Sequence, residues 1–475
     1  MANKVRTAFA NMGWMMVSQI IASVCAFIWT IVTAWYLGPS DYGIFGAAVS
    51  FAALFGIIID FGLPTYIVRA ISTDFENEHK YLDNAVSLKL FLSVLYILAV
   101  FSASVILGWQ SKLITITLLV AFENLIKSYH ALLFASFQAH EKMKYQAITN
   151  TILNVLTLIF IIIVTFTDFA LVGIAFAYII ANFIALIYEL YALKKHTILP
   201  KFSFDFSFYK VLLKAGLPFA LTGLFYTIYY SIDLVMLNQF STSYATGLYN
   251  SAYKLITVLT LFYTIYSSVV FPVMSKLFKE EKDLLKFSFV KSIKYLSLVT
   301  IPISVFTLFY GYDLIGIYGA EYIEAGGVLK ILIWTVCFLF INGACSLVLN
   351  ASHKEYSVTR IYTIAAVFNI CLNLVLIPNF SVYGASIATV LSEILILILE
   401  LYMLRKINQL PDKHLIYDII KICVASVVLG IVLYALNLNI WVAMIISIIV
   451  YFGAILLLKT VDSEDKLIVK QILGK

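Results

Sequence analysis

Residues 41–72 read DYGIFGAAVSFAALFGIIIDFGLPTYIVRAIS, and this stretch decides the fold class. Between Tyr42 and Arg69 the only side chain with a fixed charge is Asp60. An apolar run longer than about 20 residues spans a bilayer, so the stretch predicts one transmembrane helix that carries a carboxylate. A charge near the bilayer centre costs roughly 2.5 to 3.5 kcal/mol on insertion scales, which makes Asp60 a candidate functional residue. Small residues share its face of the helix and predict tight packing or a water-facing wall: Gly46, Ala53, Gly56 and Pro64.

The composition of the whole chain agrees with a membrane protein. Apolar residues make up 62% of the 475 residues, charged residues make up 12%, and the mean hydropathy is +0.98. These values lie outside the range of soluble globular proteins, and no long run alternates with period two. The five cysteines lie inside apolar runs without the spacing of metal ligands, so we expect buried packing residues and no cofactor. We predict an all-α polytopic membrane protein.

Membrane-length apolar runs recur along the entire chain and predict 14 transmembrane helices. Lysine and arginine lie almost entirely in alternate connections, and Lys112 is the only one in the other set. Basic residues favour cytoplasmic loops, so we expect a multi-pass protein of the cell membrane with both termini in the cytoplasm. The predicted spans are 9–37, 42–68, 83–108, 113–137, 144–166, 169–193, 212–238, 244–274, 287–309, 325–349, 357–377, 382–404, 414–436 and 438–459.

An internal repeat divides the chain. The end of the sixth span reads GIAFAYIIANFIALIYELYALKK from Gly173, and the end of the twelfth reads GASIATVLSEILILILELYMLRK from Gly384, an offset of 211. Upstream, FQAHEKMKY before residue 146 resembles LNASHKEY before residue 357 at the same offset. Six spans in each repeat give both copies one orientation. We predict two pseudo-symmetric six-helix bundles, residues 1–198 and 199–409, plus two C-terminal helices with a cytoplasmic tail in residues 410–475.

The eighth span carries a polar stripe that includes Asn250 and Lys254. A lysine near mid-membrane favours a wet, cavity-lining face; the alternative is a lysine that pairs with an acid and serves packing. On the seventh span Asp233 shares a face with Tyr226, Tyr229 and Tyr230, which fits either a polar cavity wall or an interfacial tyrosine belt. Both interpretations stay open for each helix.

Further intramembrane charges lie on the fourth and twelfth spans. Glu123 and Lys127 are spaced i and i+4, which favours a pair within one helix. Glu393 lies near mid-depth without a local partner, so it either pairs with a lysine of another helix or belongs to an ion path. Phosphate-binding glycine loops, zinc-ligand spacings and nucleophile elbows are absent from the sequence, and the outer loops are short. These features argue against an enzyme.

Several motifs resemble one transporter family. YLGPSDYGIFGAAVSFAALFGIIIDFGLPTYIVRAIS from Tyr36 resembles the first-to-second-span signature of the prokaryotic polysaccharide-synthesis flippases, within the multidrug, oligosaccharidyl-lipid and polysaccharide exporter superfamily. LLKAGLPFALTGL from Leu212, YGAEYIEAGGVLKIL from Tyr318 and VYGASIATVLSE from Val382 are similar to its seventh, tenth and twelfth spans. The resemblance covers nearly the whole chain and does not identify the sugar.

The resemblance implies a flippase that moves a polyprenyl-(pyro)phosphate-linked oligosaccharide across the cell membrane by alternating access, for an O-antigen or another surface glycan. It implies two six-helix lobes around a cationic cavity, lined here by Asp60, Asp233 and Lys254. The first span lacks the intramembrane arginines of the lipid II branch, so Lys254 becomes the main cavity cation, with Lys127 or Arg69. The implied partners are the lipid-linked substrate, membrane lipids, a coupling ion (H⁺ or Na⁺) and polysaccharide assembly proteins, without nucleic acid.

Asp60 itself keeps two roles. It lies roughly 18 residues, or about 27 Å, from the outer end of its helix, toward the cytoplasmic mouth. Substrate contact and a gate or hinge beside Pro64 both fit this position. Two alternative functions also stay open: a small-molecule or drug antiporter of the same superfamily, and a membrane enzyme of glycan assembly such as a polymerase.

Overall fold

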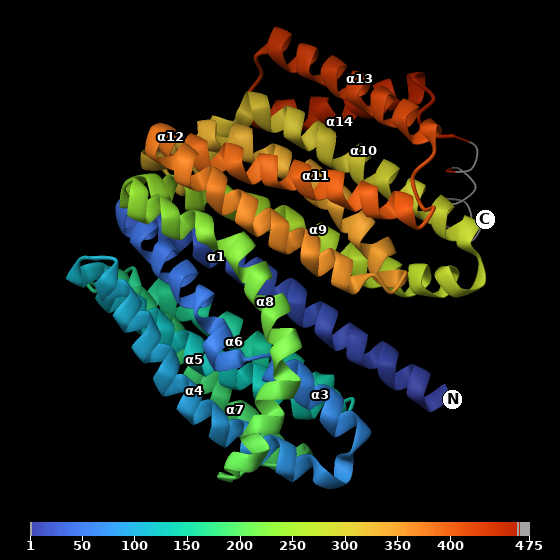
Figure 1. Cartoon of the computed structure of the whole chain (residues 1–475). Coiled ribbons are helices and arrows are strands. Elements are labelled where there is room, and N and C mark those ends of the chain that lie inside the picture. Colours follow the sequence, from blue (N-terminus) through green and yellow to red (C-terminus); the bar gives the residue numbers. More distant parts are fainter. Residues whose placement is uncertain (1, 463–464, 466–475) are drawn as a thin grey trace. The chain divides into compact units, whose positions relative to one another are not determined.

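A computed structural model describes residues 2–462 and 465, and in this part of the chain every regular element is a helix. Figure 1 shows these helices in sequence order. The α-helices are α1 (Ala2–Leu54), α2 (Gly56–Asp60), α3 (Leu63–Thr73), α4 (Glu78–Ile106), α5 (Ser111–Ala139), α6 (Met143–Val164), α7 (Ala170–His196), α8 (Phe206–Phe240), α9 (Ser243–Glu280), α10 (Lys282–Ile315), α11 (Ala325–Ala351), α12 (Glu355–Lys406), α13 (Lys413–Leu436) and α14 (Ile440–Leu457). Three short 3₁₀ turns are η1 (Phe75–Asn77), η2 (Gly316–Tyr318) and η3 (Ala320–Tyr322).

The helices account for the predicted membrane crossings. Among the described residues, 11 helices are long and apolar enough to span a membrane, and α8, bent by 46° between Leu221 and Gly223, adds a twelfth. Two of these helices each contain a kink and combine two predicted spans. The kink in α1 is at Gly38, followed by Pro39, and the kink in α12 is at Ser381, three residues after Pro378. With both counted as double crossings, the fold is the predicted all-α arrangement of 14 transmembrane helices.

The second predicted span is not one helix, which corrects the sequence-based expectation. Its helical run ends at Leu54, continues as α2 and breaks at Phe61 and Gly62, where φ is 40° and 69°. Pro64 then lies in the first turn of α3, a position where its missing N–H breaks no helical hydrogen bond. The proposed stripe from Gly46 to Pro64 therefore does not follow a single continuous face.

Backbone contact with α8 explains this break. A Cβ atom at Gly62 would lie 2.3 Å from the carbonyl oxygen of Gly216, and one at Gly216 would lie 2.3 Å from that of Phe61. Only glycines allow two backbones to approach so closely, and Gly62 also has the positive φ that glycine tolerates best. The break is thus fixed by packing.

Contacts divide the chain into two compact units, Met1–Asn250 and Ser251–Lys475. In the first, α1 packs on α5, α6 and α8, and α5 packs on α3, α4 and α7. In the second, α10 packs on α11 and α13, and α11 packs on α12; Figure 1 shows α13 and α14 beside α10. The division at residue 250 differs from the repeat boundary at 198, which stays a prediction from the sequence.

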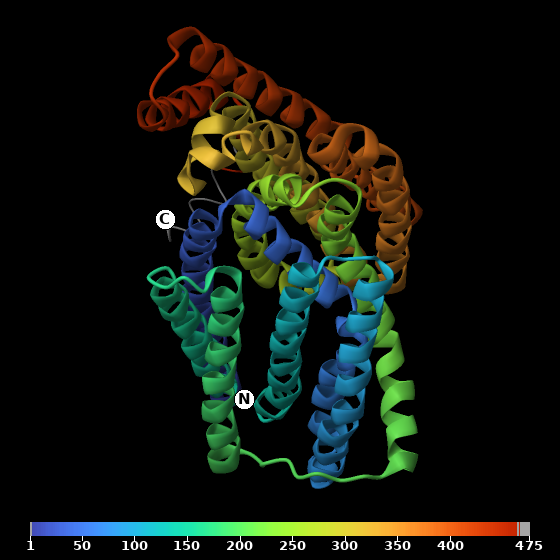
Figure 2. The same ribbon diagram turned by 90° about the vertical axis from the view of Figure 1, so that its left-hand side faces the viewer.

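The connector between α7 and α8 is held by α4 of the first unit. Figure 2 shows it crossing one end of this unit. The backbone N–H groups of Lys201, Ser203 and Asp205 donate to side chains of Asp83, Ser87 and Asn84, at 2.8, 2.8 and 3.2 Å. Three main-chain donors satisfied in this way fix the path of the connector.

The two copies of the repeat share local geometry. A residue with positive φ begins or precedes the second helix of each pair, Ala170 (φ 43°) and Ser381 (φ 49°), and the repeat glycines Gly173 and Gly384 follow three residues later. A Cβ atom at Gly173 would come within 2.8 Å of Val164, and one at Gly384 within 2.3 Å of the Leu376 carbonyl. Both glycines therefore allow the second helix of a pair to pack closely against the end of the first.

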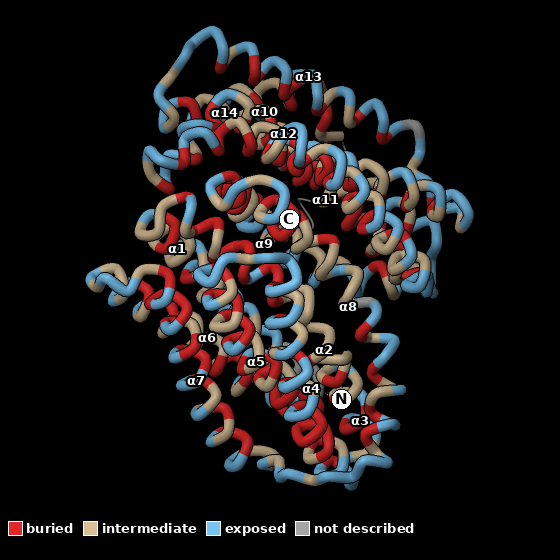
Figure 3. Tube along the Cα trace, turned by 60° about the vertical axis from the view of Figure 1, so that its left-hand side comes forward, coloured by how far each residue is buried: buried red, intermediate tan, exposed pale blue. Residues whose placement is uncertain are grey.

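Burial follows the lipid environment. Figure 3 shows buried and exposed positions alternating along α4 and α13, so each has a packed side and an outward side. Val427 and Ile431 of α13 are among many large apolar side chains on the outward sides. Such surface suits acyl chains as solvent, and each packed side carries its unit's core.

Candidate functional site

Asp60 forms an ion pair with a buried lysine of the first unit. The Lys89 ammonium lies 3.1 Å from Asp60 Oδ1 and also donates to the Ser128 backbone carbonyl, and the Ser128 hydroxyl donates to the same carboxylate oxygen. The Lys89 side chain has no exposed surface, whereas 46% of the Asp60 side chain is exposed. The cation is therefore neutralised inside the helix bundle, and its carboxylate partner stays accessible on one side.

Sequence reasoning missed Lys89. The residue lies close to the cytoplasmic end of the predicted span 83–108, where a lysine normally extends toward the headgroups. The available signal was the unpaired acid itself, because an intramembrane carboxylate needs a cation from another helix. Only the packing of α4 against α2 identifies which cation it is.

Glu123 and Lys127 form the predicted pair within α5, with 2.6 Å between the Lys127 nitrogen and Glu123 Oε1. Asn182 of α7 also donates to Glu123 Oε1, at 3.1 Å. Glu123 is buried, whereas the Lys127 side chain is 48% exposed and its nitrogen lies 5.9 Å from the centre of the Tyr178 ring. Lys127 is thus an accessible cation whose side chain is held in place by Glu123.

A buried histidine–glutamate pair lies one to two turns further along α5. His130 Nδ1 contacts Glu189 Oε2, and His130 Nε2 lies 3.1 Å from the backbone carbonyl oxygen of Asn182. A carbonyl only accepts, so Nε2–H donates to Asn182, and Nδ1 forms a second hydrogen bond with Glu189. Within the described residues, Glu189 Oε1 is buried without a hydrogen-bond partner. Sequence analysis recognised Glu189 only as a repeat residue.

The second unit contains the matching arrangement. Asn342 of α11 donates to the backbone carbonyl of Glu393, at 3.0 Å, and to Glu393 Oε2, at 2.7 Å. Ser346 donates to Glu400, whose other carboxylate oxygen is buried without a partner in the described part of the chain. Glu393 and Glu400 are the repeat partners of Asn182 and Glu189 at the offset of 211. Asn342 therefore takes the place of His130, and Glu393 is held by an amide.

Asp233 is buried in the first unit. The Tyr249 hydroxyl donates to its Oδ2 at 2.8 Å, and the rings of Tyr229 and Tyr230 lie next to each other, 5.1 Å between centres. Asn250 is also buried, and a Cβ atom at Gly46 would lie 2.7 Å from its amide nitrogen. These contacts place Asp233 and Asn250 in packed surroundings.

Lys254 and Arg69 differ from the buried acids. Lys254 is half-buried on α9, four positions after Asn250, and belongs to the second unit. Arg69 is exposed on α3. The structure thus joins Asp60 to Lys89, Glu123 to Lys127 and Asp233 to Tyr249, whereas Lys254 and Glu393 belong to the other unit. Among the described residues, no three His, Cys, Asp or Glu side chains gather as metal ligands.

Comparison with known protein families assigns the chain to one of them. The family model described as polysaccharide biosynthesis protein matches residues 8–278, more than half of the sequence. The chain belongs to this family. A second model, MatE, matches residues 218–375 of this polysaccharide biosynthesis family member.

Two relatives of this polysaccharide biosynthesis family member carry names from glycan biosynthesis. It is 25% identical to the capsular polysaccharide biosynthesis protein CapF of Staphylococcus aureus, over 84% of this chain and 99% of CapF. It is 26% identical to Agl15 of Haloferax volcanii, named as a probable low-salt glycan biosynthesis flippase, over 53% and 52% of the two chains.

Solved structures confirm the fold of this family member. The lipid II flippase MurJ in an inward closed conformation superposes with a TM-score of 0.69, over 96% of this chain and 100% of MurJ, at 17% identity. At that identity the likeness concerns the fold alone. Together with the apolar helices, this fold identifies a multi-pass membrane protein.

Proposed function

We propose that the protein moves a polyprenyl-(pyro)phosphate-linked oligosaccharide from the cytoplasmic to the outer leaflet of the cell membrane. The observation that carries the proposal is the family match over residues 8–278, which includes the broken second span with its Asp60–Lys89 pair. The relatives named as polysaccharide biosynthesis protein and glycan flippase support this class of substrate. The protein acts as a transporter in surface glycan assembly, and no covalent step is assigned to it.

The chemistry of the substrate defines what the residues do. The lipid tail stays in the bilayer, so only the anionic phosphate and the sugars need a polar path. Lys254 supplies the main cation of this path, and Lys127, half-exposed beside Glu123, supplies a second. Asp233 and Asn250 present groups that accept or donate to sugar hydroxyls when the packing around them opens. Arg69 and Glu393 belong to the proposed path as peripheral charges.

The broken second span serves as the hinge. Phe61 and Gly62 absorb the change of helix direction, and the Asp60 carboxylate directly before them is anchored by Lys89 and Ser128. Hinges are a few element-terminal residues that absorb φ and ψ changes during closure. Movement of α3 relative to α2 then requires the Asp60 pair to shift, which makes this pair the gate.

Energy for export has a direct electrostatic source. With both termini in the cytoplasm and an interior-negative potential, outward movement of an anionic headgroup gains about 2.3 kcal/mol per charge per 100 mV. Exchange of H⁺ or Na⁺ adds to this driving force. Assembly proteins that lengthen the glycan at the outer surface consume the product.

The test measures export in a deletion strain that is complemented with the wild type or with a variant. We expect Lys254→Ala to abolish surface glycan while the variant is inserted at normal levels, with completed lipid-linked units stranded on the inner leaflet. Lys112→Gln, which removes an outer lysine paired with Asp41, is the matched control and leaves export intact. Normal surface glycan with Lys254→Ala contradicts the proposal. Single repeat units at the outer surface of the deletion strain indicate a polymerase.

A drug or small-molecule antiporter is the second candidate, because the MatE model matches residues 218–375. The same deletion strain separates the two. Unchanged surface glycan together with increased sensitivity to organic cations favours the antiporter.

A further inference from the structure

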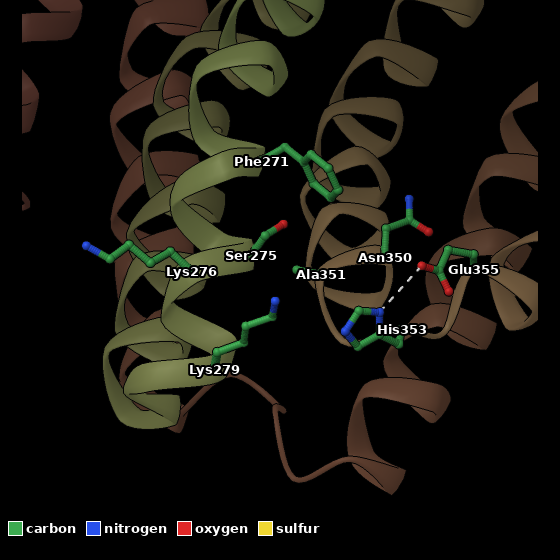
Figure 4. A pocket seen from close by; sticks show the side chains of 8 residues that line it. All are labelled: Phe271, Ser275, Lys276, Lys279, Asn350, Ala351, His353 and Glu355. Carbon is green, nitrogen blue, oxygen red and sulfur yellow. Dashed lines mark ion pairs between the residues drawn. The ribbon is translucent and has the colours of Figure 1, made fainter. Parts of the chain in front are cut away.

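A pocket of the second unit is not used by the proposed transport path. It lies between the last turns of α9 and the turn that joins α11 to α12, and holds about 390 Å³. Figure 4 shows the side chains that line it: Phe271, Ser275, Lys276, Lys279, Asn350, Ala351, His353 and Glu355. Ligand pockets in proteins begin at about 300 Å³, so this one has room for a headgroup.

We propose that this pocket binds the phosphate group of a lipid at the cytoplasmic membrane surface. The location uses the orientation given with the proposed function, whereas the binding chemistry rests on the pocket alone. Two lipids carry the same group: a membrane glycerophospholipid and the polyprenyl-phosphate carrier of the substrate.

One face of α9 changes from apolar to cationic as it leaves the membrane. Phe271, Ser275 and Lys279 are spaced by four residues, so they lie above one another on one side of the helix. The order is an aromatic ring, a hydroxyl and an ammonium, which matches the order of acyl chain, ester and phosphate in a lipid. In Figure 4, Ser275 and Lys279 extend on the side of the α11–α12 turn.

Three of the donors that line the pocket have no partner among the described residues. Upstream on α9, the hydroxyls of Thr264, Ser267 and Ser268 all donate to carbonyls of their own helix. Across the described residues, Ser275 and Lys279 take part in no hydrogen bond or ion pair through their side chains. The Asn350 amide is equally unpaired in that part of the chain. An ammonium, an amide and a hydroxyl without partners form a set suited to phosphate oxygens.

The turn that carries His353 has a defined backbone conformation. His353 has a φ of 57°, and the backbone N–H groups of His353 and Lys354 cap α11 through the carbonyls of Asn350 and Leu349. Its ring lies 3.9 Å from Glu355, the one acid that lines the pocket. Within the described residues, Glu355 forms an ion pair with His353 and none with Lys279.

At the equivalent turn of the first unit, polar side chains are paired within the protein. Glu141 has the matching φ of 55° and the same capping hydrogen bonds, at an offset of 212. There, Gln138, the equivalent of Asn350, donates to Gln146 Oε1 at 3.1 Å, and the neighbouring His140 contacts Glu78. Protein groups occupy the turn of the first unit, whereas the donors of the second unit face the pocket.

Lys276 provides a matched control in the same helix turn. Lys276 also borders the pocket, but in Figure 4 its ammonium points away from the other labelled side chains, and it pairs with Glu280 at 3.7 Å, so its charge is not offered to a ligand in the pocket. We therefore expect Lys279→Gln to weaken binding of a phosphate lipid by about tenfold or more, the effect of losing one charged hydrogen bond. Lys276→Gln stays within about twofold of the wild type, because long-range surface charge contributes little.

The experiment measures lipid binding to the purified full-length protein by native mass spectrometry. The probes are dioleoylphosphatidylglycerol, geranylgeranyl diphosphate and, as a control without phosphate, dioleoylglycerol. A Lys279-dependent loss for the first probe identifies a glycerophospholipid site, and a loss for the second identifies an entry point for the substrate carrier; either supports the proposal. Equal effects of Lys279→Gln and Lys276→Gln, or an equal loss of dioleoylglycerol, overturn it.

A second readout protects the test against misfolding of one variant. Amine-reactive labelling of the wild-type protein compares Lys279 with Lys276, and phosphatidylglycerol or geranylgeranyl diphosphate should slow labelling of Lys279 alone. Equal labelling of both lysines with and without lipid contradicts the site. Neither measurement needs transport, so a failed export test with Lys254→Ala leaves this result unaffected, and the reverse also holds.

Discussion

Lys89 and Asp60 lie 29 positions apart in the sequence, and their charged groups lie 3.1 Å apart in the structure. The lysine is fully buried, whereas 46% of the aspartate side chain is exposed. The pair joins α4 to the residue directly before the break in the second span. A change at either residue therefore acts on both the stability of the bundle and the position of α3.

Lys89→Met should destabilise the protein by removing the partner of Asp60. Breaking a buried pair costs roughly 3–5 kcal/mol, and we expect about 1–3 kcal/mol because Asp60 is half-exposed. Asp60→Asn should reduce transport and destabilise the protein at least as much, because it leaves the fully buried Lys89 ammonium without its carboxylate. The double variant should recover most of the stability lost in Lys89→Met, as measured by thermal unfolding in detergent. Strictly additive losses would show that the two residues are not coupled.

Gly62→Ala should destabilise the break in the second span. The residue has a φ of 69°, and an added Cβ atom would lie 2.3 Å from the Gly216 carbonyl. Strained left-handed backbone alone costs about 1–3 kcal/mol, and the clash adds to it. Gly56→Ala is the control in the same span, because no atom lies within 4 Å of its added Cβ. Thermal unfolding should separate the two variants, and equal midpoints would contradict the packing of this break against α8.

His130→Asn should be tolerated far better than His130→Ala. The second unit uses Asn342 to bind the corresponding backbone carbonyl, so asparagine has a precedent in this fold. Alanine leaves the Asn182 carbonyl and Glu189 without His130, and an unsatisfied buried polar group costs about 1–3 kcal/mol. Unfolding midpoints of both variants test this. A loss as large with asparagine as with alanine would mean that only the imidazole satisfies Glu189.

Stability should fall in acid through Asp462 and Asp465. Burial raises the pKa of each, but the hydrogen bonds from Lys291 and Lys294 outweigh it, so both pKa values lie below the ordinary 3.8. Groups with a lowered folded pKa stabilise above the unfolded pKa and lose this contribution as pH falls through the folded value. The loss should therefore begin near pH 4 and continue below it.

Unfolding midpoints between pH 7 and pH 3 check this expectation. Asp462→Asn combined with Asp465→Asn should be less stable at pH 7 and should show a weaker acid dependence than the wild type. Asp412→Asn is the control, because Asp412 is exposed and pairs with Lys286 at the surface. An unchanged acid profile in the double variant would assign the loss to other carboxylates.

The sequence was sufficient for the crossings because apolar length reports them directly. The kinks at Gly38 and Ser381 fall between predicted spans for the same reason. The break at Phe61 was missed because its cause, the close approach of Gly216, comes from a helix more than 150 residues away. The spacing of apolar residues along one segment cannot predict a contact with a distant helix.

The same limit applies to the site. The Glu123–Lys127 pair was predicted because both residues lie on one helix, where spacing fixes the distance. Lys89, His130 and Asn342 were missed because the partner of each lies on a different helix. The repeat aligns Glu189 with Glu400 at the offset of 211, but neither acid was predicted as a site residue.

The connector between α7 and α8 has a consequence for how the chain tolerates change. Its path is fixed through backbone N–H groups that bind Asp83, Asn84 and Ser87. Every residue except proline supplies such a donor, so the connector's own side chains at Lys201 and Ser203 are free to vary. The side chains that determine the path of this loop lie instead in one turn of α4. Substitutions at these three positions should therefore release the loop, although they lie on another helix.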